Sequence, residues 1–440
     1  MKTLIKHLFE KVRMSAWAVP TFLVLGAIVL SAFTLWVDSS HGGDFLYQIP
    51  GLNPVTAEPA RAFLSTVATS LLTLTGVAFS SMIVVLVLAS QQFGPRLLRN
   101  FIRDQVNQKV LGGLLGSFVY CLLIMRSVTS EGGFEWVPQI SMLVAFLLVI
   151  VCLGLFIHFI QHVVKQIQAE QVCANAYGVL MESIDAIFDE ERSGPDILLE
   201  DPPKGWGVRA GKRGFVQAIN HAALVSLAEE AELVIRVQER CGFFVNDVDE
   251  IFEVTTADGE RPSDELVGRI QSNLLVGAVR TNEQDLEFGI RQLVEIAMRG
   301  LSPGINDPFT AMDCIDYLGA GLQIALQRRL PASYHYDEKG ELRLIASVSD
   351  YAGIVDAAFN EIRQFGSEHC NVSCRILEAI IRCLKQPIRA EARAALIRQA
   401  DLVKDAALSQ LKAGYDREAI ESRYEVILKL KGQYEEAFSG

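Results

Sequence analysis

The sequence predicts a mainly α membrane protein, in which four transmembrane helices precede a cytoplasmic α+β portion. Two observations lead to this fold class. Four apolar segments fill residues 1–165, and the following 275 or so residues contain no further segment of that kind. A run of roughly 18 or more apolar residues is typical of a membrane-spanning helix. The first 165 residues are therefore expected to form a four-helix transmembrane domain.

The four expected spans differ in length. The first, 15–37, contains no charged residue and is too long and uninterrupted for a cleaved signal peptide, so it is expected to remain as an anchor. The second, 62–89, exceeds the roughly 20 residues that a bilayer requires. The third, 110–125, is short and is expected to recruit flanking residues from Val106 onward, and the fourth covers 137–160.

Basic residues indicate how the spans are oriented. Lysine and arginine gather at the N-terminus, in the loop between the second and third spans, and directly after the fourth span. The other two loops hold only Arg61 and Arg126. Because cytoplasmic loops carry the excess of basic residues, both termini and the whole soluble portion are expected in the cytoplasm.

Charge is divided unevenly along the chain. Residues 1–165 hold 11 basic and 7 acidic side chains, which leaves 29 of the 40 basic and 45 of the 52 acidic residues to the soluble portion, a net charge of −16. An acidic surface repels phosphate, so nucleic acid is not expected as a partner. The charge serves solubility, or it concentrates cations near a membrane pore.

The eight cysteines show no zinc-binding spacing. The nearest approach to a ligand cluster is His369-Cys370 with Cys374, and a metal there would need partners from elsewhere in the chain. We therefore expect neither a metal nor another cofactor, and interpret most cysteines as small buried apolar residues.

Six hydroxyl residues of the second span fall within about 60° of one line on a helix. They are Thr66, Thr69, Ser70, Thr73, Ser80 and Ser81. Such a stripe is typical of close helix packing in lipid, and it is also the lining expected of a pore or cavity. The span cores lack Asp, Glu and Lys, which argues against a proton-coupled pump and leaves a passive pore or no transport.

Small residues also mark the third span, where Gly112 and Gly116 form a small-xxx-small pair. Such pairs let helices approach closely. Together with the hydroxyl stripe they favour a homo-oligomer, without indicating its stoichiometry.

The loop between the second and third spans is expected to meet the lipid surface. Gly94-Pro95 ends the helix, and the basic residues that follow lie near an apolar face. These lipid-contact candidates are Arg96, Arg99 and Arg103. Plain anchoring is one interpretation, and recognition of anionic lipid is the other.

The soluble portion is expected to have three parts. The first part, 166–204, consists of a connecting helix and a linker. The helix continues from the fourth span to about Glu191, and the linker follows it. Residues 205–256 are expected to form a small β-rich domain, for which a barrel is one interpretation. Its strands are expected at 214–219, 233–237 and 242–245, with a short helix capped by Asn220.

The remaining part, 257–440, is expected to be mainly helical. Ser263 caps its first helix, and further helices begin near Asp285, Asp350, Val372, Ile388 and Arg417. A hairpin that turns at Lys339-Gly340 is expected near 334–346.

The most distinctive soluble segment is 299–311. Asp307 is suited to cap a helix that starts with Pro308, which makes this segment a well-formed turn between two helices. Asn306, Asp307 and Thr310 are alternatively ligand-loop candidates, since their side-chain oxygens suit a cation or small ligand. The segment contains no nucleophile–base pair and no phosphate-binding glycine loop.

Two motifs, SQQFGPRLLR at 90–99 and LSPGINDPFTA at 301–311, give the chain a resemblance to a known family. It resembles the bacterial "predicted membrane protein" family, the domain-of-unknown-function family twenty-two fifty-four, over nearly its whole length. The resemblance implies a bacterial inner-membrane protein and supplies no activity or site residues.

Three classes of function follow from these observations. The leading expectation is an oligomeric passive ion channel or transport-related protein with a cytoplasmic regulatory domain, an order of parts similar to that of small-conductance mechanosensitive channels. The alternative is a membrane-anchored sensor or scaffold whose cytoplasmic domain binds a ligand or partner. An enzyme is not expected, because no catalytic constellation is visible.

Overall fold

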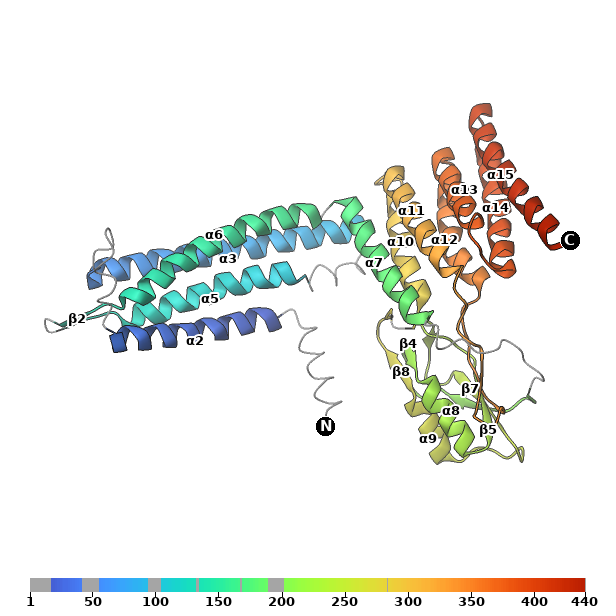
Figure 1. Ribbon diagram of the computed structural model, residues 1–440, viewed down its shortest axis with the longest axis horizontal. Helices are drawn as coiled ribbons and strands as arrows, with labels where there is room; N and C mark the ends of the chain where they lie inside the picture. Colours follow the sequence, from blue (N-terminus) through green and yellow to red (C-terminus); the bar gives the residue numbers. More distant parts are fainter. Residues whose placement is uncertain are drawn as a thin grey trace. The chain divides into compact units, whose positions relative to one another are not determined.

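The computed structural model describes residues 17–41, 55–93, 104–131, 134–166, 168–188, 202–282 and 284–439. The chain forms two compact units, Met1–Gln171 and Val172–Gly440, which are described separately (Figure 1). The lipid-contact candidates Arg96, Arg99 and Arg103 lie outside the described residues.

The first unit contains four helices, each long and apolar enough to cross a membrane, as the sequence predicted. They are α2 (Ala18–His41), α3 (Ala57–Phe93), α5 (Gln105–Ser127) and α6 (Gln139–Gln166). A short hairpin of β1 (Thr129–Glu131) and β2 (Phe134–Trp136) joins α5 to α6. Helix α5 packs against the three others and is the most buried of the four (Figure 1).

Two glycines of α5 allow this helix to pack closely against another helix of the same chain. A Cβ atom at Gly112 would lie 2.8 Å from the Cα of Pro20, and one at Gly116 would lie 3.1 Å from the carbonyl oxygen of Leu23. The small-xxx-small pair therefore brings α5 against α2 of the same chain. Because this contact within the chain accounts for both glycines, the pair gives no separate evidence for self-association.

A buried polar group holds the start of α6. The carboxylate of Asp38, in the last turn of α2, accepts hydrogen bonds from the backbone amides of Ile140 and Ser141 at 2.9 Å and from the Ser141 hydroxyl at 2.7 Å. The buried Tyr120 hydroxyl lies 3.0 Å from that of Thr34. These hydrogen bonds satisfy polar groups to which the hydrocarbon chains of lipid could offer no hydrogen-bond partner.

The helix expected to run from the fourth span to about Glu191 is in fact two helices. Helix α6 ends at Gln166, and α7 covers Ala169–Ile187. In the second unit, α7 packs closely on the helices that follow. A Cβ at Gly289 would lie 2.7 Å from the Cα of Leu180, and one at Gly321 would lie 2.6 Å from the Leu180 side chain.

The β-rich part of the second unit consists of two sheets that share one core, rather than a barrel. Its larger sheet has the strand order β3-β7-β5-β10-β9, and its smaller sheet has the order β6-β4-β8. The strands are β3 (Trp206–Arg209), β4 (Gly214–Ile219), β5 (Leu233–Val237), β6 (Phe244–Val245), β7 (Glu250–Thr256), β8 (Leu274–Gly277), β9 (Tyr334–Tyr336) and β10 (Leu342–Ile345).

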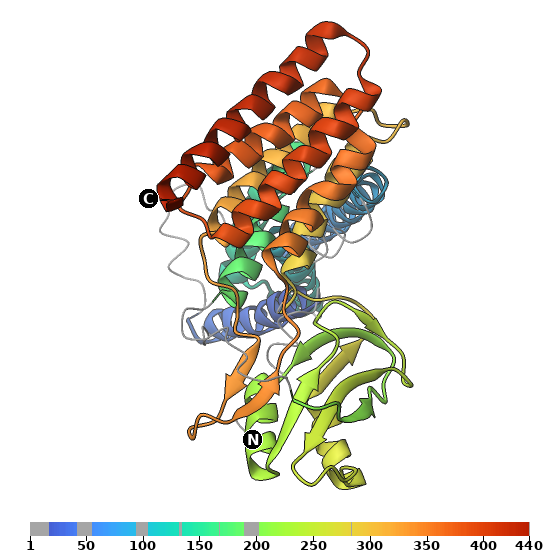
Figure 2. The ribbon, with the colours of Figure 1, turned by 90° about the vertical axis from the view of Figure 1, so that its right-hand side faces the viewer.

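The sheets reach well beyond the predicted boundary at residue 256. Strand β8 pairs with β4, and β10 pairs in parallel with β5. Figure 2 shows the β9–β10 hairpin, in orange, leaving the helices and joining the sheet. Helices α8 (His221–Glu230) and α9 (Asp264–Ser272) complete this part.

The remaining helices lie side by side as an antiparallel array (Figure 2). They are α10 (Leu286–Gly300), α11 (Pro308–Ala325), α12 (Tyr351–Gly366), α13 (Cys370–Leu384), α14 (Ala390–Gln410) and α15 (Gly414–Ser439). Predicted side-chain caps are confirmed at several helix starts, where each accepts a hydrogen bond from a backbone amide of the first turn. These caps are Asn220, Ser263 and Asp307, and Asp350 caps α12 in the same way.

Candidate functional site

The hydroxyl stripe of α3 lies on the outer surface of the first unit. Thr66, Thr69, Ser70, Thr73 and Ser80 are exposed, and Ser81 is half-buried. The face of α3 that packs against the other spans is made instead of apolar and small residues. These include Ala60, Leu64, Val67, Leu71 and Ala78. Packing within the chain therefore does not account for the hydroxyl stripe.

Most hydroxyls of the stripe are satisfied within their own helix. Thr66, Thr69, Ser70 and Thr73 each donate to the carbonyl oxygen four residues earlier, at 2.8–2.9 Å. A hydroxyl oxygen that donates in this way keeps lone pairs that can accept from water or coordinate a cation. The stripe can thus border either lipid or a water-filled space.

The turn between α10 and α11 brings Asn306, Asp307 and Thr310 together. One Asp307 carboxylate oxygen accepts from the Thr310 amide at 3.2 Å, and the other accepts from the Thr310 hydroxyl at 2.5 Å. Thr310 is buried, whereas Asn306 is exposed and has a positive φ of 51°. The carboxylate is therefore directed at its own helix, as expected of an interhelix turn.

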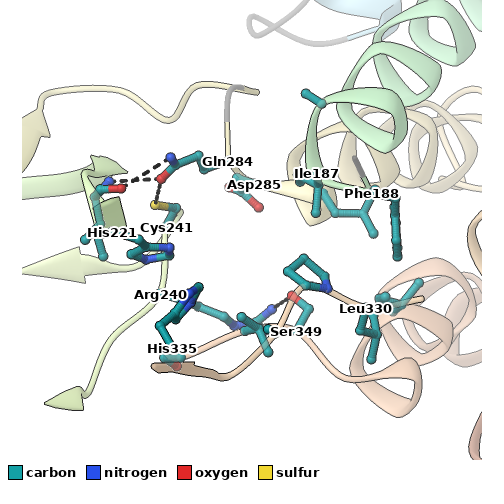
Figure 3. A pocket seen from close by; sticks show the side chains of 18 residues that line it. Ile187, Phe188, His221, Arg240, Cys241, Gln284, Asp285, Leu330, His335 and Ser349 are labelled. Atoms are coloured by element: carbon teal, nitrogen blue, oxygen red, sulfur yellow. Dashed lines mark hydrogen bonds between the residues drawn. The ribbon is translucent and has the colours of Figure 1, made fainter. Parts of the chain in front are cut away.

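The second unit contains a cavity of about 110 Å³ that the sequence did not reveal. Its lining comes from α7, the sheets, the start of α10 and the segments flanking the β9–β10 hairpin (Figure 3). One side is apolar, with Ile187, Phe188 and Leu330, and the other carries His221, Arg240, Cys241, Gln284, Asp285, His335 and Ser349. No local sequence pattern could have indicated it, because these residues come from distant segments.

Gln284 fixes one wall of the cavity. Its amide oxygen accepts from the Ile219 backbone amide at 2.9 Å and from the Cys241 thiol at 3.2 Å, and its nitrogen donates to the Ile219 carbonyl at 3.3 Å (Figure 3). The side chain thus joins strand β4 to the start of α10. A wall held by three hydrogen bonds is preorganised, as a binding site requires.

Two ion pairs neutralise most of the charge near the cavity. The Arg240 guanidinium donates to Glu287 at 2.5 Å and to the hydroxyl of Ser349. Arg280 donates to Asp285 at 2.5 and 2.8 Å. Burial raises the pKa of Asp285, and the neighbouring Arg280 opposes that rise.

His335 carries a ring nitrogen in this wall that has no partner among the described residues. Its Nε2 is buried and has no hydrogen bond, while the ring bonds the Ala332 backbone carbonyl. Burial lowers the pKa of His335, which favours the neutral ring. A neutral ring that donates through Nδ1 presents Nε2 as an acceptor. The site can therefore receive an N–H or O–H donor.

The cysteine pair noted in the sequence lies at the start of α13. The sulfur atoms of Cys370 and Cys374 are 3.9 Å apart. Burial raises the pKa of the Cys374 thiol to about 12, which disfavours the thiolate that binds zinc. Among the described residues, no group of three or more His, Cys, Asp or Glu side chains is placed to hold a metal ion.

Comparison with known proteins places the chain in a family. The model of the family described as "Predicted membrane protein (DUF2254)" matches residues 13–382. The chain belongs to this family. Similar proteins include an uncharacterized protein of Mycobacterium bovis and uncharacterized proteins of two Mycobacterium tuberculosis strains. Each is 26% identical to this family member over 94% of the chain and 80% of the relative. No solved structure matches it.

Proposed function

We propose that this integral membrane protein assembles with further copies of itself and conducts ions passively along α3. The observation that carries the proposal is the exposure of the hydroxyl stripe on the outer surface of the first unit. In a bilayer, a polar helix face is most favourable where it borders water or polar groups. Copies arranged with their stripes facing a common axis would enclose such a space.

The charges of the chain favour cations as the permeant species. The soluble portion carries a net charge of −16, and we place it in the cytoplasm, below the inner membrane of a bacterium, on the distribution of basic residues. An acidic surface beside a pore mouth raises the local cation concentration. The proposal assigns no catalytic role to the chain and no ion-coupled transport.

Replacing Thr73 by phenylalanine is expected to abolish most of the ion flux. Thr73 is exposed and lies within the stripe, so an aromatic ring there would narrow a pore lined by α3. The measurement is ion flux across liposomes that contain the purified full-length protein, with and without osmotic stress.

Ile83→Phe is the matched control. Ile83 is also an exposed α3 residue, at 45%, but it lies outside the stripe. We expect this variant to conduct like the natural protein. Unchanged flux in well-folded Thr73→Phe, or equal losses in the two variants, would contradict a pore lined by the stripe.

The second candidate function is a membrane-anchored sensor, and the cavity of the second unit favours it. Its preorganised Gln284 wall and the unpaired Nε2 of His335 are suited to a small ligand. The discriminating experiment expresses residues 166–440 alone. If this portion folds and retains a specific ligand or partner, while the full-length protein passes no ions, the result supports the sensor function and contradicts the channel function.

A further inference from the structure

Three turns of the second unit lie at the same end of the helical array. They join α10 to α11, α12 to α13 and α14 to α15, over residues 299–309, 365–370 and 411–417 (Figure 1). A Cβ at Gly366 would lie 3.3 Å from the Leu301 side chain, so the first two turns are neighbours. The Cys370 thiol donates to the Asp416 carbonyl oxygen at 3.6 Å, so the second and third turns are also neighbours. We call this surface the three-turn end.

Large apolar side chains are exposed on each of these turns. Ile305 and Phe309 are 44% and 71% exposed, Phe365 is 59% exposed, and Tyr415 is 83% exposed. The turn between α13 and α14, at the opposite end of the array, instead buries its apolar residue Ile388. Apolar side chains that gather on one exposed surface are typical of a site that contacts a protein or a membrane.

The start of α7 lies level with the three-turn end. The sulfur atoms of Cys173 on α7 and Cys314 on α11 are 3.3 Å apart. Further along both segments, Arg328 donates to the Ile184 carbonyl oxygen at 3.4 Å, so the two helices run in parallel. Each helix begins within two turns of its cysteine. Both helices therefore start at the end of the array that carries the three turns.

The chain connection holds the start of α7 close to the bilayer. The last span, α6, ends at Gln166, and α7 begins at Ala169. This connection can extend over at most about 10 Å, and the limit is the same whatever the angle between the two helices. The three-turn end is therefore the end of the array at which the chain arrives from the membrane.

The charges of the three-turn end permit contact with a lipid surface. The three turns contain three basic and three acidic side chains, which give a formal charge of zero. These are Arg299, Lys412, Arg417, Asp307, Glu368 and Asp416. The soluble portion as a whole, in contrast, carries a net charge of −16. A neutral surface with exposed apolar side chains gains free energy by leaving water and is not repelled by anionic headgroups.

We propose that the three-turn end docks on the bilayer that holds the spans, with its apolar side chains inserted at the boundary between headgroups and acyl chains. Phe309 is the leading contact, because it lies in the first turn of α11, the helix on which α7 packs. The surface recognises the apolar boundary region and requires no particular headgroup. The docking is independent of ion conduction, since it needs only the spans and the second unit.

Photocrosslinking of the full-length protein in phosphatidylcholine nanodiscs tests the proposal. The photoreactive residue p-benzoyl-phenylalanine replaces Phe309 in one variant and Tyr415 in another. Because both positions are highly exposed, the larger side chain should be accommodated without a change of fold. Lipid adducts are expected at both positions, in about tenfold higher yield than at an exposed position that meets only water.

Phe244 is the matched control position. It is also an exposed aromatic residue, at 53%, but it lies on β6 of the β-rich part. Ile187, the last residue of α7, lines the cavity together with Ile219 of β4. The sheets therefore lie at the other end of α7, a helix of 19 residues and thus roughly 28 Å long. Label at this position is expected to give little lipid adduct.

Three results would overturn the proposal. The first is absence of lipid adducts at either Phe309 or Tyr415, or a yield at Phe244 equal to theirs. The second is a crosslink from position 309 to a second copy of the chain without a lipid adduct, which would assign the surface to self-association. The third is an adduct that appears only when phosphatidylglycerol replaces phosphatidylcholine, which would mean that an anionic headgroup is recognised instead of the apolar boundary.

A pair of variants tests whether apolar insertion holds the surface on the bilayer. Ile305→Ser combined with Phe309→Ser removes the two exposed apolar side chains of the first turn, and is expected to lower the lipid adduct at labelled Tyr415 several-fold. Phe244→Ser combined with Val248→Ser removes two similarly exposed apolar side chains of the β-rich part, and should leave that adduct unchanged. An undiminished adduct in the first variant would also overturn the proposal.

Discussion

Replacing Phe252 by alanine is expected to cost the second unit about 3–5 kcal/mol of stability. Phe252 lies on β7 and is fully buried in the core that the two sheets share. Its register partners are Val208 on β3 and Val237 on β5, the two strands that flank β7. The substitution loses the free energy gained by transferring the ring from water to the core, and it leaves a cavity between three strands.

Hydrogen exchange of the full-length protein measures this loss. Amides of β5 and β7 that exchange through opening of the sheet should exchange on the order of 10²–10³-fold faster in Phe252→Ala. Phe309→Ala is the matched control, because Phe309 is 71% exposed and its removal should change exchange little. Similar effects of the two substitutions would contradict the assigned core.

Replacing Arg280 by methionine is expected to destabilise the second unit by about 3–5 kcal/mol at neutral pH. The Asp285 side chain is 4% exposed, and Arg280 is the basic group that pairs with it. Without the guanidinium, a buried carboxylate loses its counter-charge while Glu287 remains nearby. The double variant Arg280→Met/Asp285→Asn should recover much of the loss, since the asparagine can still cap α10 without a charge.

The loss in Arg280→Met should also depend on pH. The pKa of Asp285 is already raised in the folded protein by burial, and removing Arg280 raises it further. A folded-state pKa above the unfolded value means that the folded protein binds the proton more tightly. Stability therefore falls as pH rises from the ordinary value of 3.8 through the raised pKa. Unfolding measured at several pH values should show a smaller deficit in acid, and a deficit independent of pH would contradict this account.

Local signals in the sequence were sufficient for much of the fold. The spans follow from apolar length, and the helix starts at Asn220, Ser263 and Asp307 follow from cap residues that bond the first turn. The hairpin near Lys339-Gly340 follows from its turn residues, and its Gly340 has a positive φ of 82°. In each case the interaction that decides the structure lies within a few residues.

Features that depend on distant residues were not predictable in the same way. Strand β7 does not alternate strictly, because neighbouring Ile251 and Phe252 are both buried. The break between α6 and α7 carries no glycine or proline. Helical periodicity identified the hydroxyl stripe, yet only the packing of the other spans determines that this face points outward. The cavity near His335 required contacts between segments more than 100 residues apart.

The insertion of the β9–β10 hairpin has a consequence for the order in which this protein matures on the ribosome. When residues 205–277 have been synthesised, β5 still lacks the neighbour that β10 later supplies about 100 residues downstream. Until then the backbone N–H and C=O groups along that edge of β5 are unpaired, and they can pair with strands of other chains. Fragments that stop before residue 333 should consequently aggregate, whereas those that include the hairpin complete the sheet.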